Sequence, residues 1–192
     1  MIRNLAADVQ TFTSNAYLVE GKRPVLVDAG SSFDVSTRVR EHIDDIAALV
    51  LTHTHPDHVG NVPDVCEAFD VEVWGFDAEL EYVDRGLADE ELVVLGDHEY
   101  VALHTPGHKD DHLCFFAPDP AILFAGDLIF EHGGFGRTDL PEGDRGRLVE
   151  SIDRIADRTD ESLQELHPGH GPSILHEPYR HVELARQSAR MY

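Results

Sequence analysis

The stretch of sequence that decides the fold of this chain is His53-Thr54-His55-Pro56-Asp57-His58. It places four potential metal-binding side chains within six residues, directly after the continuous apolar run 46–51. Such a run is typical of a strand that is buried on both faces. Imidazole and carboxylate groups packed this closely are hard to bury unless they are paired or bind a metal. The segment therefore predicts a metal site at the end of a buried strand.

The spacing of these side chains suggests more than one ion. In an extended segment, side chains two positions apart point to the same side, so His53 and His55 can converge on one ion. Asp57 and His58 can then turn toward a second ion.

Three further polar residues follow strand-like or turn-like segments later in the chain. His108 comes after a Thr-Pro-Gly turn, Asp127 follows an apolar run and Gly126, and His170 lies between two glycines. Taken singly, either histidine has a simpler interpretation as a hydrogen-bonding loop residue, and Asp127 could be a turn-forming aspartate. Together they recur where strands end, which is where functional loops are expected.

The order of the apolar segments predicts an α+β fold in one domain, residues 1–192, with two packed sheets and helices outside. The expected strands are 16–19, 25–27, 46–51, 71–74, 100–103, 113–116, 121–125 and 163–167. The expected helices are 34–43, 60–69, 145–157 and 178–190. The first two strands should form a hairpin, and the loop 133–146, rich in glycine and charge, is a candidate rim of the site.

The charge balance is strongly acidic, because 37 acidic residues stand against 15 basic ones and give a net charge of -22. We interpret this as adaptation to a high-salt cytoplasm, where salt screens the repulsion; the alternative is simply an acidic protein. Such a surface is poorly suited to nucleic acid, so none is expected as a partner. No apolar run approaches the roughly 20 residues that cross a bilayer, so no membrane association is expected.

The N-terminal residues lack the features of a secretory signal, which favours a cytoplasmic location. The two cysteines, Cys66 and Cys114, are too few for a disulfide framework. Both are expected to be buried, unreactive thiols.

The ordered motifs resemble the metallo-β-lactamase superfamily. They are His-x-His-x-Asp-His at 53–58, Thr-Pro-Gly-His at 105–108, Gly-Asp at 126–127 and Pro-Gly-His-Gly at 168–171. The likeness extends to residues 14–18 and 27–30, which match the opening hairpin of that family. It implies a four-layer αββα sandwich with a supporting Asp28 near the site.

The resemblance also implies a division of the candidate ligands between two metals. The first metal would be held by His53, His55 and His108, the second by Asp57, His58 and His170, and Asp127 would bridge both. The expected cofactors are two divalent cations, zinc first, with iron or manganese as alternatives. Four other histidines are expected near the site or on the surface without direct catalysis: His104, His112, His132 and His167.

Within the superfamily, residues 126–130 followed by 136–141 are similar to the small glyoxalase II-like hydrolases. Glyoxalase II proper has an extra C-terminal helical region that binds glutathione, whereas about 20 residues follow His170 here. The thiol carrier is therefore open. The sequence His-Lys-Asp-Asp-His at 108–112 replaces the usual Thr and Gly after the histidine, which predicts an unusual site entrance.

The expected activity is hydrolysis of a small-molecule thioester or related ester. Two divalent cations sharing a solvent molecule would make hydroxide available at neutral pH, and Asp57 or Asp127 would be the catalytic residues that orient or relay its proton. The main alternative is a sulfur dioxygenase with one iron held by His53, His108 and Asp127. A nuclease is disfavoured by the absence of a basic arm, β-lactam hydrolysis by the absence of an export signal, and a non-catalytic binding module by the complete ligand set.

Overall fold

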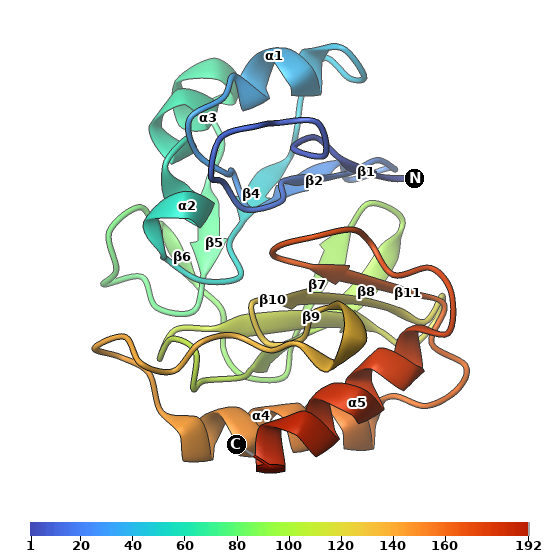
Figure 1. Cartoon of the computed structure of the whole chain (residues 1–192). Helices are drawn as coiled ribbons and strands as arrows, with labels where there is room; N and C mark the ends of the chain where they lie inside the picture. The colour runs from blue at the N-terminus through green and yellow to red at the C-terminus, as the bar shows by residue number, and fades with distance from the viewer. Residues whose placement is uncertain (192) are drawn as a thin grey trace.

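Two β-sheets face each other in the computed structural model, which describes residues 1–191, and helices cover the outer side of each sheet (Figure 1). The strand order is β1-β2-β3-β4-β5-β6 in the first sheet and β11-β10-β9-β8-β7 in the second. The α+β, four-layer αββα sandwich predicted from the sequence is thereby confirmed.

The strands are short. Those of the first sheet are β1 (Ile2–Asn4), β2 (Tyr17–Val19), β3 (Val25–Val27), β4 (Ala48–Val50), β5 (Val73–Gly75) and β6 (Arg85–Gly86). Those of the second sheet are β7 (Glu91–Leu95), β8 (His98–His104), β9 (Leu113–Ala117), β10 (Ile122–Gly126) and β11 (Glu165–Pro168). The expected hairpin is present, because β2 and β3 pair antiparallel.

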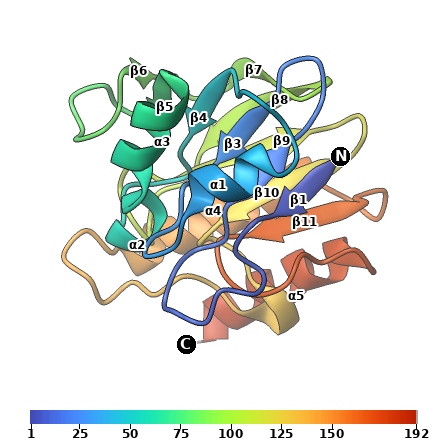
Figure 2. The same cartoon turned by 90° about the horizontal axis from the view of Figure 1, so that it is seen from above.

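The helices lie outside the sheets. They are α1 (Val35–Arg40), α2 (Pro56–Val59), α3 (Val62–Phe69), a 3-10 turn η1 (Glu131–Gly133), α4 (Arg145–Arg158) and α5 (Pro178–Met191). Helices α1 and α3 lie over the first sheet, as the view from above shows, and α4 and α5 lie under the second sheet (Figure 2).

Burial on both faces explains why the strands are continuous apolar runs. In β3, Val25 and Val27 pack between the two sheets, whereas Leu26 points outward into the cluster that includes α1 and α3. In β9, Phe115 packs between the sheets, and Cys114 points into the cluster formed with α4 and α5. Strands buried in this way need apolar residues at consecutive positions rather than at alternate ones.

Local capping sets where two of the helices begin. Helix α1 starts after Asp34, whose side chain accepts the backbone N–H of Thr37 at 2.9 Å. Helix α4 starts after Asp144, which accepts the N–H of Arg147 at 3.0 Å. A side chain that satisfies a free N–H at a helix start is the usual N-terminal cap. Helix α1 ends at Arg40 and is therefore shorter than the expected segment 34–43.

Strands β1, β6 and β7 and helix α2 were not predicted. The first two strands are three and two residues long and depend on pairing with β2 and β5 rather than on a pattern of their own. Strand β7 alternates buried and exposed residues as an edge strand can.

The expectation that both cysteines are buried is half wrong. Cys114 is buried, but Cys66 on α3 is partly exposed because it lies beside the buried position Val65.

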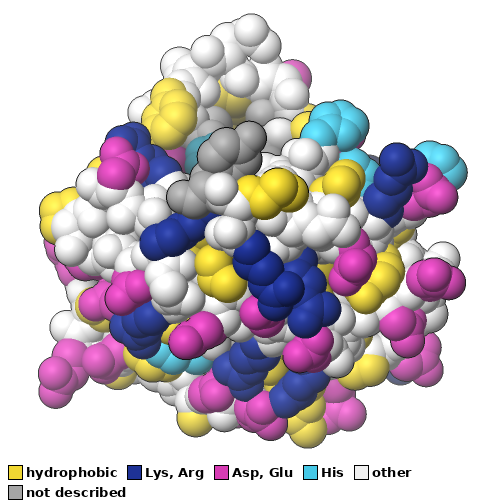
Figure 3. All heavy atoms as spheres, turned by 60° about the horizontal axis from the view of Figure 1, so that its bottom comes forward, with side chains coloured by type: hydrophobic (Ala, Val, Ile, Leu, Met, Phe, Trp, Pro, Cys, Tyr) yellow, Lys and Arg dark blue, Asp and Glu magenta, His cyan; other side chains and the backbone are white. Residues whose placement is uncertain are grey.

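The acidic excess is not spread evenly over the molecule. Helices α4 and α5 carry seven arginines against four acidic residues, so the negative charge lies on the remaining elements. Figure 3 shows the α4–α5 side, where basic and acidic side chains are interspersed. Arg186 and Arg190 of α5 both reach Asp153 of α4, at 2.9 and 2.6 Å.

Within residues 1–191, no helix combines the length and apolar character that a membrane crossing requires.

The packing between the sheets gives a first test. Phe115→Ala removes a side chain that is 0% exposed, and it should lower the free energy of unfolding by about 3–5 kcal/mol through lost burial and a cavity. Urea denaturation monitored by circular dichroism measures the change. The control Leu92→Ala, at a side chain 60% exposed, should change it by less than about 0.5 kcal/mol. Similar effects of the two substitutions would contradict this packing.

Candidate metal centre

The seven candidate ligands predicted from the sequence come together at the edge of the two sheets where α2 lies (Figure 1). His53 and His55 follow β4, and Asp57 and His58 lie in α2. From the second sheet, His108 follows β8, Asp127 follows β10 and His170 follows β11. The pairs β3–β4 and β10–β11 are parallel, so the carboxyl ends of their strands meet at one edge.

The chain turns sharply within the histidine run. The backbone of His55 is extended, and α2 begins at Pro56, a residue whose fixed φ suits the first helical position. The extended spacing inferred from the sequence therefore holds for His53 and His55 only. The helix redirects Asp57 and His58, which gives a structural reason why they lie apart from the first two histidines.

The side chains form two separate groups of three, and a third group, His53, His58 and Asp127, overlaps both sets of candidate ligands. In the first, ligand atoms of His53, His55 and His108 all lie within 4.8 Å of one another. In the second, the same limit holds for Asp57, His58 and His170. These are the two sets into which the family resemblance divides the candidate ligands.

Asp127 lies between the two groups. Its Oδ2 is 3.4 Å from Nε2 of His108 and 3.5 Å from Nε2 of His170, and its Oδ1 is 3.4 Å from Nε2 of His58. A single carboxylate thus reaches members of both groups, as a bridging ligand would have to.

Several of these atoms have no other partner. Among residues 1–191, Nε2 of His58, Nε2 of His108 and Oδ1 of Asp127 are buried without a hydrogen bond. A buried polar atom left in this state costs about 1–3 kcal/mol, which a cation would offset. Imidazole nitrogens and carboxylate oxygens are also the donors that zinc and similar divalent ions prefer. The residues present therefore fit divalent metal ions.

Asp28 supports the centre from beneath, as the resemblance implies. Its Oδ1 accepts the backbone N–H of Thr52 at 2.7 Å, and its Oδ2 accepts the Thr52 hydroxyl at 2.7 Å. The Nδ1 of His58 lies 2.8 Å from the same Oδ2, so Nδ1–H can donate to it. This contact leaves Nε2 of His58 facing the cluster, an arrangement common for metal-binding histidines. Thr52 adjoins the histidine run, but its role was not anticipated from the sequence.

His112 is fully buried and supports Asp127. Its Nε2 accepts the backbone N–H of Asp127 at 3.0 Å, so the ring proton lies on Nδ1, 2.8 Å from the hydroxyl of Thr105. Burial lowers the pKa of His112 well below its usual value, which keeps this acceptor available. The histidine therefore fixes the turn that carries Asp127 from behind, in line with its expected place near the site.

The other three histidines in that group belong to different surroundings. His104 stacks on Phe76 at 3.8 Å, and His132 is exposed in η1. His167 is buried on β11 and lies 2.9 Å from Glu165. They take no part in the two groups of ligands.

The unusual segment after His108 forms a partly buried ion-pair network beside the histidine run. Asp111 accepts the N–H and hydroxyl of Thr54, at 3.1 and 2.6 Å, and so holds the residue between His53 and His55. Lys109 lies 3.5 Å from Asp111 and pairs with Glu142 of the loop 133–146. Asp111 and Thr54 are 57 positions apart, so no local sequence pattern could have revealed this contact.

The protonation states divide the histidines into two kinds. Burial lowers the pKa of His53 well below its usual value and that of His55 to about 4, so both are neutral and able to bind metal. Burial acts in the same direction on His58 and His170, but nearby carboxylates outweigh it. They hold the pKa of His58 well above its usual value and raise that of His170 to about 9. These two rings carry protons that a bound cation would displace.

A cavity of about 570 Å³ opens over the centre. Beside the candidate ligands, its walls are formed mainly by the apolar side chains of Phe12, Phe130, Phe135 and Leu140. The ring of Phe12 stacks on His170 at 5.8 Å although it is 80% exposed. The last two wall residues belong to the loop 133–146, so its expected position at the rim is confirmed.

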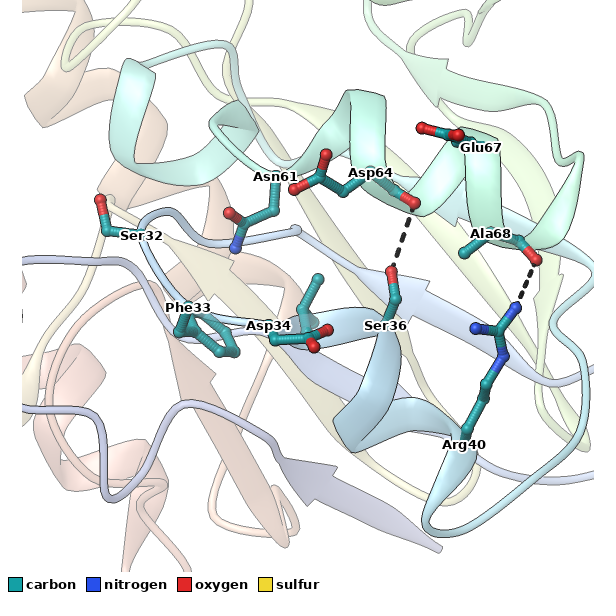
Figure 4. Close-up of a pocket in the computed structure, with 10 residues that line it drawn as sticks. Ser32, Phe33, Asp34, Ser36, Arg40, Asn61, Asp64, Glu67 and Ala68 are labelled. Carbon is teal, nitrogen blue, oxygen red and sulfur yellow. Dashed lines mark hydrogen bonds between the residues drawn. The ribbon is translucent and has the colours of Figure 1, made fainter.

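A larger hollow of about 770 Å³ lies elsewhere, between α1 and α3 (Figure 4). Arg40 donates across it to the carbonyl of Ala68, and Ser36 donates to the carbonyl of Asp64. These contacts tie the two helices together. None of the candidate ligands lines this hollow, so it is separate from the metal centre.

Comparison with known proteins identifies the family that this fold and cluster define. Residues 9–170 match the model of the metallo-beta-lactamase superfamily, and the chain belongs to that superfamily of metal-dependent hydrolases.

Three known proteins show the range of its relatives. Hydroxyacylglutathione hydrolase GloC of Haemophilus influenzae is 29% identical over 75% of this chain and 79% of that protein. An atrochrysone carboxyl ACP thioesterase of Aspergillus chevalieri is 29% identical over 92% of this chain and 57% of that protein. The crystal structure of TTHA1623 in a di-iron-bound form is 31% identical, covers 91% of this chain and 92% of that one, and has a TM-score of 0.72.

Gly169 offers a test of the cluster that does not remove a ligand. A Cβ at this position would lie 2.1 Å from Oδ1 of Asp127 and 2.9 Å from Cε1 of His58, so Gly169→Ala must displace the carboxylate. Metal affinity, measured by competition with a chromophoric chelator, should fall about tenfold to 100-fold. The control Gly146→Ala in α4 meets only Oδ1 of Asp144, at 3.3 Å, and should leave the affinity unchanged. Equal affinities in the two variants would contradict the arrangement.

Proposed function

We propose that this protein is a dinuclear metal-dependent hydrolase that acts on a thioester. The observation that carries the proposal is the position of the Asp127 carboxylate between two groups of three side chains, with its buried Oδ1 lacking a hydrogen-bond partner within residues 1–191. The names of two relatives support the thioester, since one is called a hydroxyacylglutathione hydrolase and the other a thioesterase.

In this proposal one metal is held by His53, His55 and His108, the other by Asp57, His58 and His170, and both by Asp127. When bound, two divalent cations would lower the pKa of a shared water toward about 7 and stabilise an oxyanion. Zinc is the metal we propose, with iron or manganese as alternatives.

Two carboxylates of the chain are placed to handle the proton of the attacking water. Burial opposes the charged form of Asp127, but the neighbouring histidine charges hold its pKa well below its usual value, and bound cations, which would displace the histidine protons, would favour the carboxylate in the same way. Asp57 is likewise held ionised against burial by its contact with His170, at 3.1 Å. Both can accept a hydrogen bond from the water and orient it, and we propose them as the catalytic residues.

The cavity favours a substrate whose leaving group departs without help. Apart from the candidate ligands, the only ionisable side chain among the described residues that line it is Arg137, which is too basic to act as a general acid. A thiolate leaves readily without protonation, whereas an amide nitrogen does not. The lining therefore suits a thioester better than an amide.

Metal quantification on protein purified at high salt, followed by turnover of S-lactoyl thioesters, tests the proposal. Two equivalents of metal and thioester hydrolysis are expected. One equivalent of iron with oxygen consumption would instead identify the dioxygenase alternative, which uses His53, His108 and Asp127 and leaves the second group without a role.

Removal of one member of the second group should lower the metal content. His58→Ala deletes a nitrogen that faces both Asp57 and Asp127, at 4.0 and 3.4 Å, so the bound metal should fall from two toward one equivalent. Plasma mass spectrometry of dialysed protein gives the ratio. His98→Ala, at an exposed histidine of β8, is the control and should retain both equivalents. An unchanged content in His58→Ala would contradict the dinuclear assignment.

Removal of the shared carboxylate should abolish catalysis. Asp127→Ala eliminates the side chain that joins the two groups, and the thioester kcat/KM should fall at least about 1,000-fold. Asp127→Asn, which preserves the size but not the charge, should lose nearly as much. The exposed Asp44→Ala serves as the control for loss of one negative charge. Turnover retained by either Asp127 variant would refute the proposed role.

A further inference from the structure

The cavity over the metal centre is strongly apolar for a protein of such high charge. Phe12, Phe130, Phe135 and Leu140 line it, and Phe12 leaves 80% of its surface exposed although it stacks on His170. Exposed aromatic surface at the mouth of a site is available for a ligand to cover. An apolar acyl group would bury this surface, whereas a small polar one would leave it in water.

The one cationic side chain other than histidine in this cavity is already neutralised. Arg137 donates from Nε and from an Nη to the two carboxylate oxygens of Asp139, at 2.7 and 2.6 Å. This two-point pairing matches the geometry that arginine would use to bind a substrate carboxylate or phosphate. Asp139 thus occupies the position that an anionic substrate group would need.

An adjoining hollow of about 510 Å³ likewise has no unpaired arginine or lysine on its described walls. It shares His55 and Pro56 with the first cavity, so the two hollows adjoin at these residues. Its only cationic side chain among the described residues is Lys109, which is paired with Asp111 and Glu142. Glu81 also lines this hollow and adds a further negative charge.

We infer that the substrate is an uncharged thioester with an apolar acyl group, and that the exposed Arg137–Asp139 pair lowers the preference for anionic thiol carriers. This inference rests on the proposed thioesterase function and specifies its substrate class. A carrier with a net negative charge would find no unpaired arginine or lysine on the described walls, and it would approach a protein of net charge -22. An uncharged carrier meets neither penalty.

Matched substrates test the charge preference. The hexanoyl thioesters of N-acetylcysteamine, which is neutral, and of glutathione, which carries a net negative charge, share the same acyl group and differ in their carrier. In 0.1 M KCl the neutral substrate should have a kcat/KM at least about tenfold higher, and the ratio should shrink at 2 M KCl because salt screens the repulsion. An equal or higher kcat/KM for the glutathione thioester would overturn the inference while leaving the hydrolase function intact. Hydrolysis of neither by the metal-loaded protein would instead refute the proposed function.

Substitution of Asp139 tests whether its ion pair keeps Arg137 from binding an anionic thiol carrier. Asp139→Asn frees Arg137 and should raise kcat/KM for the glutathione thioester about fivefold, the value of one exposed ion pair, with less than a twofold change for the neutral thioester. Addition of Arg137→Gln to this variant should remove the gain. The control Glu161→Gln deletes one exposed negative charge elsewhere and should have little effect on either substrate. No selective gain in Asp139→Asn would overturn the role of the pair.

The apolar wall is tested with acyl chains of different length on N-acetylcysteamine. From acetyl to hexanoyl, kcat/KM should rise by up to about fourfold per methylene, because each fully buried methylene adds favourable transfer energy. Phe12→Ala should flatten this trend, because it removes part of the apolar wall. Leu92→Ala, at an exposed leucine outside the cavity, should preserve the trend. A flat series in the unaltered protein would overturn the preference for an apolar acyl group.

Discussion

The buried carboxylate of Asp127 is the interaction on which the arrangement of the site depends. It lies within 3.5 Å of ring nitrogens from His58, His108 and His170, which come from elements of both sheets. Gly169 approaches it so closely that a Cβ at this position would displace it, and His112 fixes its backbone from behind. The strand ends and the helix turn at Pro56 bring side chains from both sheets to this carboxylate.

The parts of the structure that could be predicted are those encoded locally. The run 53–58 and the apolar strand before it belong to one short segment, and the two-sided burial of the strands leaves a continuous apolar pattern. Four of the seven predicted ligands come from this segment, whereas His108, Asp127 and His170 were predicted from the order of their motifs along the chain, through the family resemblance. The hydrogen bonds of Thr54 to Asp111 and the stacking of Phe12 on His170 could not be predicted. They join segments far apart in sequence, and their geometry depends on how the two sheets are placed.

The protein is highly charged, but the cavity over the metal centre is largely apolar. The chain has a net charge of -22, whereas the walls over the centre, apart from the candidate ligands, are mainly aromatic and aliphatic. The arginine and the lysine that line the two hollows both form ion pairs with acidic side chains, Arg137 with Asp139 and Lys109 with Glu142. Long-range charge and local lining therefore act together, because both reject an anion, and only the lining attracts an apolar group.

The division of the centre between the two sheets has a consequence for how the chain matures. The first sheet contributes His53, His55, Asp57 and His58, and the second contributes His108, Asp127 and His170. Neither half of the sandwich holds a complete set, so under the proposed ligation a cation gains its full coordination only after both halves have docked. Metal binding would then distinguish folded from partly folded chains. A chain whose two sheets have not packed together would bind the ions weakly and would be inactive.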